Sequence, residues 1–485
     1  MELIDDEGNL FGVVNVVDAL VVLLVVAVIA AGVALVNPFA SSEDATRYAT
    51  LDLGEQRPYV TELISEGDVL SPSNSDSNAT VTDVYVTPSG DENATVTVRV
   101  RMDGQLVESG ETGRSVFSLA GTTIQRGTNL RLGSDEYTID GIVRSYAESG
   151  KSLQISETSI TVSESVSTAT AEAISRGDTF VVGGDTVATI TDVHVAPGNS
   201  SNVRHVTVGA TVETLNRSGP SFAGQRVSLG RNFSFRSDGY ELTGEIQAVG
   251  NATVRTGTES VVLRASVSPE TAQSIDEGDA YRIAGNEVAR ISTVRTYPSS
   301  KDGRLMAVLG MKLVTVDRSG EQYVGDRLVQ VGTAIPFQSD SYQLTGNVVT
   351  QGSLSLPGEA TTRSVEIQLE SVAPEVADSL STGMVERSGS TVSARVTDVQ
   401  VDPAVVTLTS ESGDIYRREH PVKKDVVLTV ELSGRETPAG LYFHGEALQV
   451  GRTVLLDFST VTVEGTVVRI PPTSTTNSTG TSVVG

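Results

Sequence analysis

Residues Thr189–Pro197 read TITDVHVAP, and a stretch of this kind, which ends in proline, occurs four times in the chain. Its apolar side chains, Ile190, Val193 and Val195, fit the pattern of a strand with one buried face. The other copies read TVTDVYVTP to Pro88, RISTVRTYP to Pro298 and RVTDVQVDP to Pro403. This recurrence predicts an internal repeat of about 100 residues.

Two further landmarks keep the same order in every copy. Ahead of the strand stands a short Gly-Asp pair, namely Gly67-Asp68, Gly177-Asp178 and Gly278-Asp279, with Gly383-Met384 in the last copy. Behind it, a closing segment reads LGSDEYTIDG to Gly141, FRSDGYELTG to Gly244, FQSDSYQLTG to Gly346 and the diverged DFSTVTVEG to Gly465. Three landmarks in one order indicate four copies of a single domain.

The expected fold is all-β, with an N-terminal transmembrane helix followed by four tandem repeats of about 100 residues. Each repeat is expected to be a small β-barrel or a sandwich of about six or seven strands, and both architectures remain open. Each also has one short helix, clearest at Pro269–Ile275 and Pro374–Leu380, because proline suits the first helical position. The closing glycine predicts a bend or the close approach of another backbone. The expected boundaries are 1–18 for a short acidic segment, 19–40 for the anchor, 48–150, 155–252, 255–352 and 360–470 for repeats 1 to 4, and 471–485 for a disordered Ser/Thr-rich tail.

The anchor prediction rests on Ala19–Val36, a run of 18 residues without a charged or polar side chain. A run of this length can span a bilayer core. A cleavable signal peptide would begin with basic residues, whereas this leader carries Glu2, Asp5, Asp6 and Glu7. We therefore expect a retained, single-pass anchor in the cell membrane.

The composition limits the classes of partner. The formal net charge is −26, from 61 acidic and 35 basic residues. Repulsion among so many negative charges favours a salt-adapted protein, because concentrated salt screens it. The alternative is an acidic surface in a protein that works at ordinary salt. Acid spread along the chain argues against nucleic acid as a partner. With no cysteine, disulfides and thiolate metal sites are excluded.

Seven asparagines begin an N-x-S/T triplet and are candidate N-glycosylation sites: Asn78, Asn93, Asn199, Asn216, Asn232, Asn251 and Asn477. Because N-glycosylation occurs outside the cytoplasm, they favour an extracytoplasmic main body. Asparagine in Ser/Thr-rich turns is the alternative reading.

The sequence contains no recognisable catalytic, cofactor or metal motif. We therefore predict no enzyme activity, no cofactor and no metal site. His194 shares its slot with Tyr85, Arg295 and Gln400, and this variety predicts an outward-facing position. Two acidic positions recur, Asp83, Asp192 and Asp398 in the T-D-V strand and Asp135, Asp238 and Asp340 after serine in the closing segment. Each has too few ligands for calcium, and an Asx turn explains the second set.

The first twenty residues carry a pattern that runs directly into the apolar segment: Ile4-Asp5, Gly8, Leu10-Phe11-Gly12, Asn15 and Asp18. This pattern resembles the opening of domain-of-unknown-function family 4330, membrane-anchored proteins of haloarchaeal or cyanobacterial type. The Y-x-L-x-G of the closing segment, preceded by Leu229-Gly230 or Val331-Gly332, resembles the family's C-terminal pattern. The resemblance implies a membrane location and supplies no activity.

A second, looser similarity is to mammalian-cell-entry domains, extracytoplasmic β-barrels that move lipids. It rests on Gly278-Asp279, Gly285, Ala289, Ile291 and Val294, which recur in the same spacing from Gly177-Asp178 onward. We expect a membrane-anchored binding or structural protein, a scaffold or adaptor for an envelope protein or a glycan, with oligomers left open. A lipid-binding or lipid-transfer protein is the alternative. A glycan hydrolase would need two carboxylates facing one cleft.

Overall fold

A computed structural model describes residues 9–10, 14–15, 21, 24–25, 27, 43–73, 75–90, 93–108, 115–150, 152–299, 303–389, 391–409 and 415–471. Most of the predicted anchor, 19–40, and nearly all of the predicted tail, 471–485, lie outside the described residues. Among those that are described, no helix has both the length and the apolar character needed to cross a membrane. Within the predicted N-terminal segment, β1 (Asn9–Leu10) pairs antiparallel with β2 (Val14–Asn15).

The described chain from residue 43 onward is all-β, and it contains four similar sheets, each accompanied by one short helix. Repeat 1 comprises β3 (Glu43–Gln56), α2 (Pro58–Thr61), β4 (Val69–Leu70), β5 (Ala79–Ser89), β6 (Asn93–Glu108), β7 (Ser115–Leu119), β8 (Thr122–Thr123), β9 (Asn129–Gly133) and β10 (Thr138–Ala147). Repeat 2 comprises β11 (Ile155–Ser167), α3 (Thr168–Ala173), β12 (Thr179–Val182), β13 (Asp185–Pro197), β14 (Val203–Asn216), β15 (Pro220–Phe222), β16 (Gln225–Arg226), β17 (Asn232–Ser237) and β18 (Tyr240–Val249).

Repeat 3 comprises β19 (Thr256–Val267), α4 (Pro269–Ser274), β20 (Ala280–Ile283), β21 (Asn286–Pro298), β22 (Leu305–Arg318), β23 (Glu321–Val324), β24 (Arg327–Leu328), β25 (Ala334–Gln338) and β26 (Gln343–Gln351). Repeat 4 comprises β27 (Glu359–Val372), α5 (Pro374–Ser379), β28 (Val385–Ser388), β29 (Thr391–Thr409), β30 (Ile415–Thr437), β31 (Gly440–Phe443), β32 (Glu446–Ala447), β33 (Thr453–Asp457) and β34 (Thr462–Arg469). Each sheet has eight strands rather than the predicted six or seven, because two-residue strands such as β8 show no period in the sequence.

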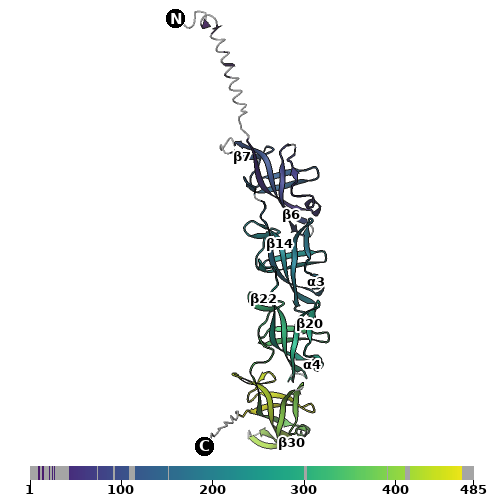
Figure 1. Cartoon of the computed structure of the whole chain (residues 1–485). Coiled ribbons are helices and arrows are strands. Elements are labelled where there is room, and N and C mark those ends of the chain that lie inside the picture. Colours follow the sequence, from purple (N-terminus) through teal and green to yellow (C-terminus); the bar gives the residue numbers. More distant parts are fainter. Residues whose placement is uncertain are drawn as a thin grey trace, which may run out of the picture. The chain divides into compact units, whose positions relative to one another are not determined.

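Figure 1 shows the four sheets, and the strand order is the same in all of them. In repeat 1 it is β4-β5-β6-β3-β10-β9, and the β7–β8 hairpin extends from β6. Ser71, next to β4, and Gly133 in β9 exchange backbone hydrogen bonds of 2.8 and 2.9 Å, which join the two ends of this sheet. A single curled sheet therefore forms the repeat, rather than two separate sheets packed face to face.

Contacts group the residues into two compact units: Met1–Ile160 with Gly177–Ile190 and Ala210–Glu241, and Thr161–Arg176 with Thr191–Gly209 and Leu242–Gly485. Inside each curled sheet the long strands bury one face, except where β29 and β30 extend beyond Pro403. The core of repeat 1 includes Leu51, Val98 and Leu132, all fully buried. Repeat 3 places Leu263, Leu309 and Phe337 in the same way. The expected alternation is confirmed at Tyr342–Val348, whereas in Thr189–Pro197 Ile190 is buried and Val193 and Val195 are half-buried like His194 between them.

The closing glycine lies on the inner face of its strand, where another strand passes close by. A Cβ atom built on Gly141 would lie 2.7 Å from Leu53 Cδ2 and 3.1 Å from Leu51 Cβ. A Cβ atom on Gly465 would lie 2.5 Å from Ile367 Cγ2. The predicted approach of a backbone is found at Gly244, where a Cβ would lie 2.7 Å from the Ser163 carbonyl oxygen, whereas at Gly141 and Gly465 the nearest atoms belong to core side chains of the facing strand.

We expect Gly141→Ala to lower the free energy of unfolding of repeat 1 by about 1–2 kcal/mol, because the added methyl group overpacks the core. Hydrogen exchange of the β3 and β10 amides in the full chain measures this change. Gly239→Ala is the matched control, since its Cβ would meet no atom within 4 Å. Equal effects of the two substitutions would contradict the packing explanation.

Candidate functional site

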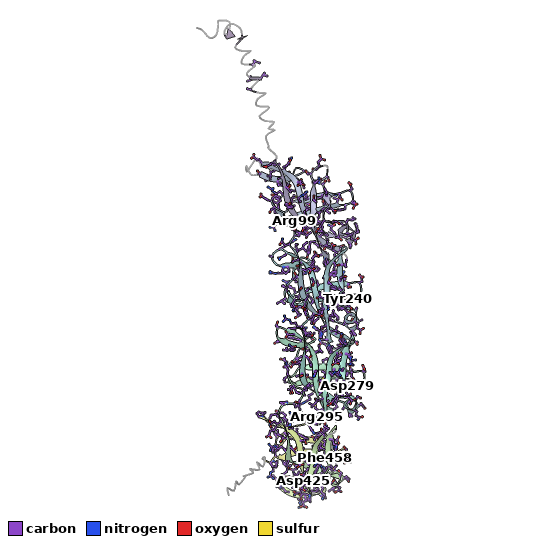
Figure 2. The ribbon with its side chains drawn as sticks, in the orientation of Figure 1. Arg99, Tyr240, Asp279, Arg295, Asp425 and Phe458 are labelled. Atoms are coloured by element: carbon purple, nitrogen blue, oxygen red, sulfur yellow. The ribbon has the colours of Figure 1, made fainter. Side chains whose placement is uncertain are left out.

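The Gly-Asp landmark and the tyrosine of the closing segment meet in space. In repeat 2 the Tyr240 hydroxyl donates to Asp178 Oδ2 at 2.5 Å. Tyr137 donates to Asp68 and Tyr342 to Asp279 in the same way. Figure 2 labels Tyr240 and Asp279, which belong to the pairs of repeats 2 and 3. We call this hydrogen-bonded pair the Asp–Tyr clasp.

The aspartate of the clasp also accepts a hydrogen bond from the backbone just before the Gly-Asp pair. Asp279 Oδ2 accepts the Asp276 amide at 3.0 Å, as Asp68 Oδ2 accepts the Ser65 amide at 2.9 Å. Burial, and then the hydrogen bond to aspartate, raise the pKa of the Tyr342 hydroxyl above its ordinary value. The phenol therefore remains a hydrogen-bond donor throughout the neutral range.

Repeat 4 replaces both partners of the clasp together. Met384 stands in place of the aspartate and Val461 in place of the tyrosine, and both pack against the apolar core of that repeat. The turn itself is kept, because the Phe458 amide bonds to the Val461 carbonyl at 3.0 Å as Ser339 bonds to Tyr342 at 2.9 Å. An apolar contact thus substitutes for a polar one at the same place in the fold.

We expect Tyr342→Phe to destabilise repeat 3 by about 1 kcal/mol, because Asp279 loses a charged hydrogen bond in a partly exposed position. The double variant Asp279→Met with Tyr342→Val copies repeat 4 and should recover most of that loss. Thermal unfolding of the full chain, followed by hydrogen exchange in β25 and β26, reports both. A double variant weaker than the single one would contradict the equivalence of the two pairs.

In repeats 2 and 3 the residue at the T-D-V aspartate position holds the linker to the next repeat. Asp192 Oδ2 accepts the Val254 amide at 2.9 Å, beyond the end of β18. In repeat 3 Thr293 takes this role, since its hydroxyl donates to the Leu354 carbonyl at 3.2 Å. Across the strand pair lie Gly209 and Gly310, where a Cβ would collide with a linker carbonyl. Both linkers thus cross a glycine.

Repeat 1 departs from this arrangement because Arg99 faces Asp83 in the strand pair. Arg99 and Asp83 are 6% and 8% exposed, and Arg99 donates to the Thr50 hydroxyl at 2.9 Å. Burial lowers the pKa of Arg99, and the charge of Asp83 opposes that shift. Asp398 of repeat 4 is exposed and lies across from Thr429. The position therefore holds a linker in repeats 2 and 3, through Asp192 and Thr293.

The second recurrent set, Asp135, Asp238 and Asp340, is exposed. The turn is made by the preceding serine, since Ser339 Oγ accepts the amides of Ser341 and Tyr342 at 3.2 Å. Ser134 does the same in repeat 1. The predicted Asx turn is therefore a serine turn in these two repeats. In the described residues, no group of three His, Asp or Glu side chains could hold a metal ion.

The variable slot that contains His194 does not face outward in every repeat. Arg295 and Gln400 are exposed, whereas His194 is half-buried and Tyr85 is 5% exposed. The Tyr85 hydroxyl donates to the Ser221 carbonyl at 3.0 Å and lies 3.3 Å from the Glu213 carbonyl, both in repeat 2. The outward prediction is wrong for Tyr85, because its ring faces repeat 2, and it holds for Arg295 and Gln400.

Repeats 2 and 3 meet around a buried imidazole. Arg318 Nη2 donates to His205 Nε2 at 3.0 Å and to the Gly325 carbonyl at 3.1 Å. The other ring nitrogen lies 3.3 Å from Ser165 Oγ. Burial, together with the nearby charge of Arg318, lowers the pKa of His205 to about 4. The imidazole is therefore neutral at pH 7.

Repeats 3 and 4 meet around a second histidine. His444 stacks on the Tyr297 ring with a centroid separation of 4.5 Å. Its Nε2 lies 2.9 Å from Glu386 Oε2. Glu386 is 2% exposed and also accepts the Ser393 hydroxyl at 2.8 Å. Arg264 of repeat 3 donates to the Gly445 carbonyl.

A pocket of about 650 Å³ is lined by residues of repeats 2 and 3. Most of its lining is polar and includes Ser200, Ser268, Arg304, Gln338 and Thr345. Hydroxyl and amide groups of this kind suit a ligand that forms hydrogen bonds.

The candidate glycosylation sites lie mainly at strand ends. Asn78, Asn93, Asn216 and Asn232 are exposed, whereas Asn251 is half-buried and its Oδ1 accepts the Thr253 amide at 2.9 Å. Asn199 is exposed, and its Nδ2 donates to Asp326 at 3.3 Å. Because a glycan attaches to Nδ2, modification of Asn199 would displace that bond. Asn477 lies outside the described residues.

A scan against family models matches the domain of unknown function DUF4330 over residues 1–146 and 349–471, more than half of the chain. The chain belongs to the DUF4330 family. The matched residues cover repeat 1 with the segment before it, and repeat 4 with the linker before it. Repeats 2 and 3 stand between the two DUF4330 matches. No curated protein matches the chain.

The family resemblance expected from the N-terminal pattern is thereby confirmed. The DUF4330 description names no activity, ligand or partner. The similarity to mammalian-cell-entry domains stays a prediction.

Proposed function

We propose that this DUF4330 chain is a membrane-anchored, extracytoplasmic scaffold or adaptor that holds a binding surface for an envelope protein or a glycan. The apolar run Ala19–Val36 and the candidate glycosylation sites support the location. Contacts between consecutive repeats support a role as a scaffold, in which each repeat is held against the next.

The observation that carries the proposal is Tyr85. Its ring is buried, and its hydroxyl meets two backbone carbonyls of the next repeat. Hydrogen bonds are directional, so contacts of this kind hold one repeat at a defined angle to its neighbour. Domains joined by flexible linkers alone would have no need of them. The polar pocket lined by repeats 2 and 3 suits a glycan better than a lipid tail.

The first test is to tag the full chain in its native cells, extract it gently at high salt, and identify co-purifying proteins and lipids by mass spectrometry. A stoichiometric protein or glycan partner supports the scaffold. A solitary monomer whose deletion leaves the envelope unchanged contradicts it. Stoichiometric lipid in a homo-oligomer would favour the lipid-transfer alternative.

A matched pair of variants tests the role as a scaffold. Tyr85→Phe keeps the ring and removes the hydroxyl, whereas Tyr59→Phe changes a tyrosine that is 60% exposed on α2. We expect Tyr85→Phe to raise hydrogen exchange in β15 and to reduce recovery of the partner. Tyr59→Phe should change neither. Full recovery with both variants would show that partner binding does not need the rigid junction.

A further inference from the structure

Repeat 4 carries a β-ribbon that the other repeats lack. The ribbon is formed by β29 and β30. The equivalent strand pairs, β5–β6, β13–β14 and β21–β22, are joined by the short connections 90–92, 198–202 and 299–304. In repeat 4, β29 has 19 residues and β30 has 23, and their pairing continues beyond Pro403 to Thr409 and Ile415. Asp425, labelled in Figure 2, fixes the base, since its carboxylate accepts the Ser371 amide at 2.7 Å.

Both edges of this ribbon are open in the described part of the chain. β28 pairs with β29 only over 391–395, and β27 pairs with β30 only over 424–436. Residues 405–409 and 415–419 therefore pair with each other alone. A two-stranded ribbon is marginally stable by itself, and open strand edges readily pair with another chain.

The two edges differ in charge. Residues 405–409 read VVTLT, without a charged side chain, whereas 415–419 read IYRRE. Native proteins usually protect an open edge with charged residues or proline, and the β29 edge has neither over these five residues. Both strands are exposed here, since Val405 of β29 is 46% and Ile415 of β30 is 70% exposed. Because only the β29 edge has no charged side chain, it is the edge suited to pairing with another strand.

We infer that residues 405–409 pair antiparallel with the same residues of a second copy of this chain, about a twofold axis at Thr407. In this register Val405 lies opposite position 409 and Val406 opposite position 408, so no charged residue faces another. The two β30 strands are then separated by three strand spacings, about 14 Å. Because the Debye length is about 10 Å at 0.1 M salt, repulsion between the Arg417 and Arg418 side chains of the two copies is screened.

A second copy suits this end of the chain for another reason. In repeat 3 the equivalent end of the strand pair is covered by repeat 4, where Tyr297 stacks on His444. At the equivalent end of repeat 4, Val405 and Thr407 are exposed in the described residues. The inference stands on the described residues of repeat 4 and holds independently of the proposed function.

Disulfide crosslinking tests this pairing, because the chain has no native cysteine and any disulfide must form at an introduced one. Thr407→Cys and Val405→Cys place one thiol each on the same strand, and both positions are exposed. Directly opposite residues of an antiparallel pair have Cβ atoms about 5 Å apart, within reach of a disulfide. Residue 405 faces position 409, so the two thiols of a Val405→Cys pair lie too far apart. After mild oxidation of the full chain, the Thr407→Cys variant should form a covalent dimer, and the Val405→Cys variant should remain a monomer on a non-reducing gel.

Thr407→Lys supplies a second measurement, because a charge on the open edge should abolish the pairing. Val422→Lys, on β30 at a residue that is 57% exposed, is its control. Sedimentation of the wild type and Val422→Lys as dimers, with Thr407→Lys as a monomer, supports the inference. Equal crosslinking at residues 405 and 407, crosslinking at neither, or a dimer that survives Thr407→Lys would overturn it.

Discussion

Replacing His444 by alanine is expected to lower the free energy of unfolding of repeat 4 by about 2 kcal/mol. The reason is that Glu386 is 2% exposed and its side chain would lose a buried hydrogen-bond partner, His444 Nε2. Ala120 and Ala223 hold the equivalent turn position at the same positive φ, so alanine adds no new backbone strain. Hydrogen exchange of β28 and β33 in the full chain measures the loss.

A double variant separates the lost hydrogen bond to Glu386 from the lost ring contacts of His444. Repeat 2 has Phe180 where repeat 4 has Glu386, and Ala223 where repeat 4 has His444. Glu386→Phe combined with His444→Ala therefore copies a natural pair and should recover most of the stability. If the double variant is as unstable as His444→Ala alone, the contact with Tyr297 rather than the carboxylate explains the loss.

Lowering the pH from 7 to 5 is expected to weaken the junction of repeats 2 and 3 by about 2 kcal/mol through His205 alone. Its pKa is about 4 in the folded protein, against 6.5 ordinarily, because burial and Arg318 disfavour the cation. The folded state thus binds fewer protons than the unfolded state in this window. The contribution is complete above about pH 6.5, falls as the pH drops, and levels off below about pH 4.

His205→Gln is the control for this pH effect, because an amide can still accept from Arg318 but does not titrate. Asp326, Arg327 and His194 also act on the imidazole, and they remain in both proteins. The difference in unfolding temperature between wild type and variant, measured at pH 7 and pH 5, isolates His205. The same pH dependence in both proteins would show that carboxylates alone govern acid sensitivity.

The repeat architecture could be predicted because its landmarks recur in the same order within one chain. What those landmarks do could not, because Asp279 and Tyr342 are far apart in sequence and meet only when the sheet curls. The joint replacement by Met384 and Val461 in repeat 4 was a usable signal. Two positions that change together within one chain indicate contact.

Side-chain orientation at Tyr85 was mispredicted for a physical reason. Variation within a repeat family indicates exposure only when every copy has the same surroundings. Tyr85 faces backbone carbonyls of repeat 2, whereas Arg295 and Gln400 are exposed in repeats 3 and 4. The surroundings of this position therefore differ from repeat to repeat.

The linkers that cross Gly209 and Gly310 bear on how such a chain changes its length. Each linker is held by the repeat it leaves, through Asp192 in one case and Thr293 in the other. A repeat therefore carries its own exit, and a duplicated copy can follow it without redesign of the rest. The two linkers that share this arrangement leave repeats 2 and 3, the two repeats that stand between the matched DUF4330 segments.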